Sequence, residues 1–216
     1  QIISLTLTGI VSNPGNITDL DIPSSAEYEG ATYPVKKIGY RAFNGSRITS
    51  DNIGEGIEEI DAEAFYVTGQ LVKVVFPSTL KTIGVGAFYL SGIAEFNLPE
   101  GLLTIKRSAL DTAKLTSLHI PASVQEIGAP PARTSTALTA ITVDSGNLNY
   151  TAQDGVLYTK DMKTLVSYPR GKTGATFAIP SGVEELGRMA FFGVAALTGV
   201  TLPAGLLTIG EECFLA

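Results

Sequence analysis

The order of apolar and polar residues in the segment 71–88, LVKVVFPSTLKTIGVGAF, predicts two short strands joined by turns. In its first half, Val74 and Phe76 point to one side and Val75 points to the other, as in a strand with one buried face. The strand ends at Pro77, because proline has no backbone N–H to donate to a sheet.

The second half of this segment completes one coil of chain. Leu80 and Ile83 enclose two polar residues and predict a second short strand, which ends at Gly84. Ala87 and Phe88 then send a small and a large side chain inward from a helical or irregular turn. A single coil cannot cover its own apolar edge, so coils of this kind must stack on one another.

The pattern returns every 22 or 23 residues. The isoleucines that close the second strand show this spacing: Ile38, Ile60, Ile83, Ile105 and Ile127. A fixed period in this range is typical of stacked-repeat proteins, and the length of the chain then predicts a solenoid of about eight coils.

Each coil repeats the same kinds of residue at the same places. The large residue after the second strand is, in chain order, Phe43, Phe65, Phe88, Leu110, Ala132, Phe191 and Phe214. The residue before it is small, and because Cys213 occupies this place we interpret it as a buried hydrophobe rather than a nucleophile. The column expected to face outward from the first strands is Asp21, Asn52, Val75, Asn97, His119, Thr142 and Thr201.

The frame L-x-x-[IV]-x-[IL]-P-x-x-[VL]-x-x-I-G-x-x-A-F is carried by residues 71–88, 93–110, 115–128 and 197–214. It resembles the BspA-like class of leucine-rich repeats. The resemblance implies a curved, β-rich α/β leucine-rich-repeat solenoid of short strands with helical or irregular turns. It also implies export to the surface of a bacterium, where such proteins take part in adhesion or macromolecule binding and carry no catalytic residues.

These repeats predict a single domain over residues 1–216. Its first part, residues 1–46, resembles the longer N-terminal cap repeat of the family, and residues 144–178 interrupt the period with a hairpin insertion. The resemblance implies an extracellular or cell-surface location on a bacterium. Because the chain starts at residue 1 without a signal peptide, we take that peptide to have been removed.

The last repeat is followed by no polar capping repeat, so we predict that the C-terminal cap is absent. In that case Leu206, Ile209 and Phe214 lie on an uncovered final coil.

Composition narrows the functional classes. The net charge is −6 and the lysines and arginines form no cluster, which argues against nucleic-acid binding. Residues 189–210 carry no charge and are long enough for a membrane span, but their glycines, Pro203 and the repeat register favour a coil with few charges. We therefore expect no membrane span in this chain.

We find no residues that predict catalysis. His119 is the only histidine and lies on the outward side of its strand without a partner at a telling spacing. A zinc site needs three or four ligands, and no glycine-rich phosphate-binding motif is present. The sequence predicts a non-enzymatic protein with no cofactor and no metal site. The loop residues Asp144, Asp154 and Asp161 leave bound calcium open as an alternative, although they do not have EF-hand spacing.

Two functional hypotheses remain. The first is a surface binding or adhesion module that recognises a protein or a glycan through the solenoid. The second is a structural spacer or stalk of a larger exported protein, with no ligand of its own.

For a binding module, the sequence places the recognition surface in the interrupted region, residues 129–178. Insertions in repeat proteins gather on one face, often the binding face. This one concentrates aromatic and cationic residues: Tyr150, Tyr158, Lys160, Lys163, Tyr168, Arg170 and Lys172. The alternative is that the hairpin is only an elaborated coil that packs on the stack.

A second candidate surface follows the large-residue column. Tyr66, Tyr89 and Phe192 each come directly after a phenylalanine of that column. They either form an exposed aromatic ridge or wedge between coils.

Overall fold

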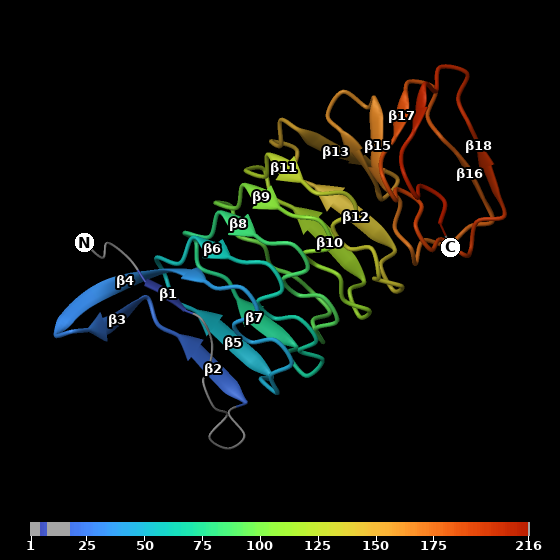
Figure 1. Ribbon diagram of the computed structural model, residues 1–216. Coiled ribbons are helices and arrows are strands. Elements are labelled where there is room, and N and C mark those ends of the chain that lie inside the picture. Colours follow the sequence, from blue (N-terminus) through green and yellow to red (C-terminus); the bar gives the residue numbers. More distant parts are fainter. Residues whose placement is uncertain (1–4, 8–17, 216) are drawn as a thin grey trace.

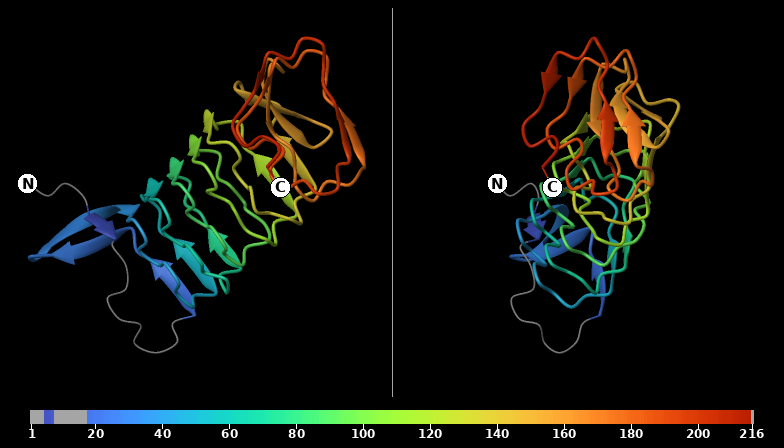
Figure 2. Two further views of the ribbon diagram at one scale, coloured as in Figure 1. Left: turned by 45° about the vertical axis from the view of Figure 1, so that its right-hand side comes forward. Right: turned by 90° about the vertical axis from the view of Figure 1, so that its right-hand side faces the viewer.

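The computed structural model describes residues 5–7 and 18–215, and in it the chain winds into an elongated stack of coils (Figures 1 and 2). Its β-solenoid of about eight coils confirms the predicted leucine-rich-repeat architecture. The turns are irregular, and the described residues contain no helix. Of the predicted cap region 1–46, residues 1–4 and 8–17 lie outside the described residues.

One face of the stack is formed by the second strands of the coils. Its first sheet pairs neighbouring coils in parallel, except that β3 joins β4 as an antiparallel hairpin. Its strands are β1 (Leu5–Leu7), β3 (Ser25–Tyr28), β4 (Ala31–Ile38), β6 (Glu59–Ile60), β8 (Thr82–Ile83), β9 (Thr104–Ile105) and β11 (Glu126–Ile127).

A further sheet continues this face beyond β11. Its strands are β13 (Tyr150–Gln153), β14 (Val156–Thr159), β15 (Thr164–Ser167), β17 (Glu185–Leu186) and β19 (Thr208–Ile209). The first three are antiparallel to their neighbours in the order β13-β14-β15, and the last three run parallel.

The first strands of the coils form a second face, split into three parallel sheets. These are β2 (Asp19–Ile22), β5 (Ser50–Ile53) and β7 (Lys73–Val75); β10 (Ser117–Ile120) and β12 (Ala140–Val143); and β16 (Thr176–Ala178) and β18 (Gly199–Thr201). Residues 93–98 form no strand between β7 and β10. There Phe96 takes the place of Val74 and Leu118, and its buried ring packs 5.4 Å from that of Phe88.

The predicted isoleucine ladder is confirmed. Each isoleucine from Ile38 to Ile127 pairs in register with the next, and all are buried. The same column continues with Leu165 within the insertion and with Leu186 and Ile209 beyond it. Burial of each such side chain contributes about 1.5–3 kcal/mol, which explains why these positions stay apolar while their neighbours vary.

The large-residue column forms a second ladder inside the turns. Phe65 stacks on Phe43 and on Phe88, with ring centroids 5.2 Å and 5.1 Å apart. Leu110 and Ala132 continue the column without rings, and Phe191 and Phe214 stack again at 5.0 Å. Cys213 is buried at the place where other coils have alanine, as predicted.

The turns share a backbone feature. Three residues after the ladder isoleucine or leucine, φ is positive in most coils: Arg41, Glu63, Gly86, Ser108, Met189 and Glu212. The fifth coil has Pro130 at this place, and the proline ring fixes φ near about −65°. The turn there departs from the others, and its Ala129–Pro130 peptide bond is cis.

The last coil exposes apolar side chains. Ile209 is 50% and Phe214 46% exposed, whereas Leu206 is half-buried. No helix in the described part of the chain is long and apolar enough to cross a membrane.

Candidate functional site

The insertion contains the predicted hairpin. Strands β14 and β15 are antiparallel, with Tyr158 opposite Leu165. The sequence did not indicate β13, which adds a third antiparallel strand. Because β15 also pairs in parallel with β17, its Thr164 and Leu165 form a regular rung of the solenoid. The insertion is thus an elaborated coil that carries the ladder onward.

Two tyrosines of the predicted recognition surface lie in the core. Tyr158 is 1% and Tyr168 4% exposed. Tyr168 occupies the large-residue column, where its ring stacks 5.1 Å from that of Phe191. Burial, with a smaller contribution from Asp154, raises the pKa of Tyr158 far above its ordinary value. The prediction is therefore wrong for Tyr158 and Tyr168, because the interrupted repeat still needs large side chains to fill its coil.

Tyr150 joins the insertion to the regular coils. Its hydroxyl accepts a hydrogen bond of 2.8 Å from the backbone N–H of Ile127, on the edge strand β11. Burial raises the pKa of Tyr150, although this hydrogen bond acts in the opposite direction. The side chain is half-buried, so it closes a sheet edge more than it offers a binding surface.

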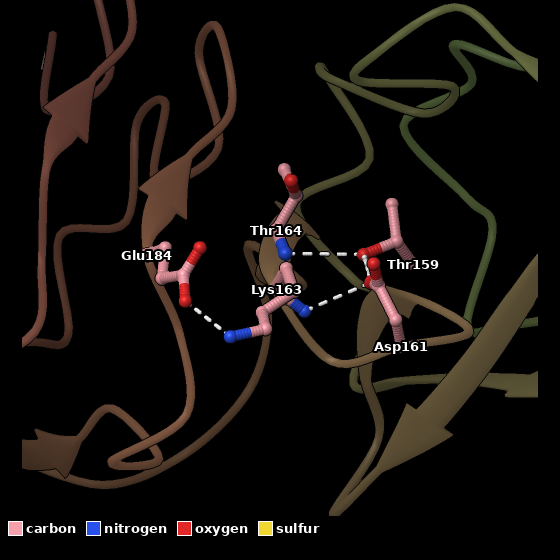
Figure 3. A network of polar contacts seen from close by, with 5 residues as sticks. All are labelled: Thr159, Asp161, Lys163, Thr164 and Glu184. Atoms are coloured by element: carbon pink, nitrogen blue, oxygen red, sulfur yellow. Dashed lines mark hydrogen bonds and ion pairs between the residues drawn. The ribbon is translucent and has the colours of Figure 1, made fainter.

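The cations of the insertion are more accessible but separate. Lys160 is exposed at the β14–β15 turn, and Lys163 forms an ion pair with Glu184 of the next coil (Figure 3). Asp161 closes this turn by accepting hydrogen bonds from the Thr159 hydroxyl and the Lys163 backbone N–H. These bonds, the backbone one first, oppose the effect of burial and lower the pKa of Asp161.

The two remaining residues lie at the other end of β15. Arg170 is half-buried and donates from Nε to the Gly193 carbonyl at 2.9 Å. Lys172 is half-buried close by. The structure thus divides the seven predicted residues among the core, a sheet edge and two ends of a strand.

Ion pairs between coils line the second-strand face. They join a cation of one coil to an acid of the next, as in Lys36–Glu58 at 2.7 Å and Lys106–Glu126 at 2.9 Å. Exposed pairs of this kind contribute about 0–1 kcal/mol each. Opposite charges 20–24 residues apart were the signal that sequence reasoning missed.

The first-strand face presents the predicted outward column. All seven of its side chains, from Asp21 to Thr201, are exposed. His119 Nδ1 lies 3.0 Å from the Thr142 hydroxyl oxygen, and no carboxylate or thiol joins this pair. Within the described residues, no group of three or more His, Cys, Asp or Glu side chains is arranged to hold a metal ion.

A recess opens among the turns. Tyr66 and Tyr89 are half-buried and stacked, with ring centroids 5.0 Å apart, so they are neither a free ridge nor fully wedged between coils. They line a pocket of about 250 Å³, called the tyrosine recess below, together with Glu63, Arg107, Ser108 and Arg133. The Arg133 guanidinium lies 5.2 Å from the centre of the Phe192 ring. Sequence reasoning found the three aromatic residues but neither arginine.

The repeats themselves decide the classification. A sequence profile described as "BspA type Leucine rich repeat region" matches six copies over residues 12–139 and 172–216. The chain belongs to this family. No curated protein sequence matches it.

Solved structures of bacterial leucine-rich repeat proteins share the fold. A leucine-rich repeat protein from Eubacterium ventriosum is 25% identical, with a TM-score of 0.71 over 85% of this chain and 57% of its own. The pneumococcal vaccine antigen PcpA is 24% identical, with a TM-score of 0.73 over 98% of this chain and 61% of its own. A leucine rich cell surface protein from Faecalibacterium prausnitzii is 28% identical, with a TM-score of 0.53 over 98% and 69%. This chain spans less than two thirds of the first two.

Two carboxyl groups of this BspA-type domain are buried. Asp51 is 2% exposed, and neither of its oxygens has a hydrogen-bond partner in the described part of the chain. Burial and, secondarily, Asp21 raise the pKa of Asp51 to about 7. Burial also raises the pKa of Asp111 to about 6, against the effect of the Thr134 backbone N–H that it accepts.

Neither carboxyl group has a catalytic setting. Asp51 takes an inward place between Leu20 and Val74 of the adjacent coils, and Asp111 packs beneath the turns beside Arg133. Repeats of this family typically form non-enzymatic binding scaffolds.

Proposed function

We propose that this chain is a non-enzymatic binding or adhesion module of a bacterial cell-surface protein, which recognises a protein or a glycan through the solenoid surface. The observation that carries this proposal is the regular exposed surface of the coils. Parallel pairing fixes each coil on the next, so outward side chains repeat at a constant place over a long face. Solenoids use such extended, ordered faces for recognition.

The comparisons support the location as well as the function. One similar structure is a cell surface protein and another is a vaccine antigen, and both are bacterial. We therefore propose the same surface location for this chain.

A structural spacer is the second candidate. The outward column of the first strands is small, polar and weakly charged, and it lacks the Trp, Tyr and Arg side chains that dominate binding hot spots. A spacer needs only the rigid ladders and no ligand.

A glycan array combined with a pull-down against host extracellular proteins separates these candidates. A binding module retains a partner, and that partner protects a localised set of residues from hydrogen exchange. A spacer retains none in either format.

The insertion cations that remain accessible stay a predicted contact. Lys160→Ala and Lys163→Ala test them on any partner found, with Lys114→Ala, an exposed lysine outside the insertion, as the matched control. Affinity that falls for the pair and not for the control, at an unchanged melting temperature, supports contact by the insertion. Unchanged affinity rules it out.

A further inference from the structure

The tyrosine recess marks a vacancy in a column of side chains. The residues directly after the large-residue ladder lie one above another from Asn44 to Arg133, because each of these turns bonds to the next through the same backbone groups. In chain order this turn column reads Asn44, Tyr66, Tyr89, Asp111, Arg133, Pro169 and Phe192. Asp111 is the member of this column that points into the protein. It is fully buried, and its carboxylate accepts a hydrogen bond from the Thr134 backbone N–H.

The vacancy has the thickness of one ring. Tyr66 and Tyr89 show the spacing of this column, with 5.0 Å between ring centres. Because Asp111 is turned inward, the face of the Tyr89 ring opposite Tyr66 has no side chain of the next coil beside it. The next member of the turn column on that side is Arg133, two coils away, or about 10 Å at the usual strand spacing. At the edge of this space the Arg133 guanidinium lies 5.2 Å from the centre of the Phe192 ring. A flat group placed here would continue the stack of Tyr66 and Tyr89.

Some charged side chains around the recess have an ion-pair partner and others do not. Glu63 is held by Arg41 at 2.6 Å. Arg133 Nε lies 3.6 Å from Asp111 Oδ2, which is longer than a hydrogen bond. Arg107 is exposed and has no ion-pair partner among the described residues. The free donors of the recess therefore belong to arginine, which suits a planar carboxylate.

We propose that the tyrosine recess binds an acidic sugar unit, a hexuronate or a sialic acid, of a glycan. The sugar ring stacks on Tyr89, since polarised C–H groups are attracted to the negative face of an aromatic ring. Its carboxylate binds Arg107, and the Glu63 carboxylate accepts hydrogen bonds from its hydroxyl groups. This inference rests on the proposed function and names the ligand class and the site.

The shape of the recess favours a sugar over a peptide. It holds one ring in a pocket of about 250 Å³ and is bounded by the turns on either side. Most peptide-recognition modes use an exposed sheet edge or an apolar groove, and acidic peptide motifs are bound by clusters of arginine. The recess offers an aromatic face and charged donors and acceptors, which match a hydroxylated ring with one carboxylate.

Binding of acidic saccharides to the purified protein tests the proposal. The probes are trigalacturonate, hyaluronan hexasaccharide and 3′-sialyllactose, with lactose as the neutral control, measured by calorimetry and by NMR titration. We expect at least one acidic probe to bind with a dissociation constant below about 1 mM and lactose to bind at least about tenfold more weakly.

Variants locate the binding. Arg107→Gln should weaken the acidic probe by about tenfold or more, because it removes a charge-assisted contact. Tyr89→Leu should weaken it similarly, whereas Tyr89→Phe keeps the ring and should retain binding. Arg47→Gln and Tyr28→Leu alter exposed residues outside the recess and serve as matched controls. Unchanged melting temperatures establish that each variant is folded.

Several results overturn the proposal. They are the absence of binding by every acidic probe, equal binding of lactose, or full binding by both Arg107→Gln and Tyr89→Leu. Binding of hexaglutamate with the same dependence on Arg107, in place of the saccharides, assigns the recess to acidic peptides instead. If a partner from the array or pull-down binds both variants normally, the proposed function stands and this site falls.

Discussion

The regular coils between Ile38 and Ile127 and the insertion at residues 144–178 bury the same ladders with different strand arrangements. The regular coils stack in parallel, each residue on its equivalent. The insertion folds into an antiparallel meander, yet it returns Leu165 to the second-strand ladder and Tyr168 to the large-residue ladder. Continuity of the core therefore constrains the side chains at ladder positions more strongly than it constrains the path between them.

This comparison also reassigns the surface. The insertion is rich in tyrosine and cations, but its tyrosines lie in the core or at a sheet edge. The regular coils look plain in sequence, yet their turns bring Tyr66, Tyr89 and Arg107 to one recess. Side chains 18–41 residues apart meet there because the coils repeat.

The largest expected effect comes from breaking the regular ladder. Ile83→Asp places an unpaired carboxylate at a fully buried position and should lower the free energy of unfolding by more than about 4 kcal/mol. Lys81→Asp, two residues away and exposed, should cost less than about 1 kcal/mol. Urea denaturation followed by circular dichroism measures both. Equal stability of the two variants and the parent protein would show that the inward and outward assignments are wrong.

The next effect compares the two regions directly. Phe88→Ala and Tyr168→Ala each remove one ring from the large-residue ladder and should each cost about 3–5 kcal/mol. Tyr168→Phe keeps the ring and should cost less than about 1 kcal/mol. A loss of several kcal/mol for Phe88→Ala alone would mean that the insertion does not carry the ladder.

The buried acid Asp51 gives stability a pH dependence. Because its pKa is raised to about 7 in the folded protein, the unfolded chain releases this proton at lower pH than the folded chain does. Stability should therefore fall as pH rises from about 4 to about 7 and stay level above that range. Asp51→Val, which matches Val74 of the next coil, should remove this part of the slope.

Thermal melts of the parent and of Asp51→Val between pH 4 and pH 8 check this expectation. At pH 8 the variant should be more stable by about 2–4 kcal/mol. Asp111 contributes a slope of the same sign in both proteins, so the difference between them isolates Asp51. Parallel curves for the two proteins would contradict the assignment of a protonated, buried Asp51.

The smallest effect concerns the ion pairs of the two regions. Double-mutant cycles to alanine at Lys36–Glu58 and at Lys163–Glu184 should both give coupling energies of about 0.2–1 kcal/mol, because both pairs are exposed. Coupling well above about 2 kcal/mol in the insertion pair alone would indicate that its turn depends on that contact.

The fold could be predicted closely from the sequence, because the repeat period shows which residues occupy the same place in successive coils. Ile83 and Ile105 could be placed in one ladder from spacing alone. The period is interrupted by the insertion. Nothing in the sequence around Tyr168 distinguishes a tyrosine of the large-residue ladder from a tyrosine on the surface. Composition then suggested a binding surface at a place where packing required a ring.

The recess was beyond sequence reasoning for a different reason. Arg107 comes two residues after its ladder isoleucine, Ile105, whereas Arg133 comes six residues after Ile127. They occupy different places in the repeat, so no column read from the sequence contains both. Asp111 stands in the same column as Tyr89, and its polarity suggested nothing of its burial. Only the inward turn of this carboxyl group, held by the Thr134 backbone N–H, opens the space.

Hydrogen exchange of the protein with and without a bound acidic saccharide is the most direct test of this division between a structural insertion and a binding recess. With the tightest of the acidic probes bound, exchange should slow at residues 63–66, 84–90, 105–112 and 130–134, which contain the residues that line the tyrosine recess. It should remain unchanged at residues 156–172. Slowing confined to residues 156–172 would contradict the account and return the binding surface to the insertion.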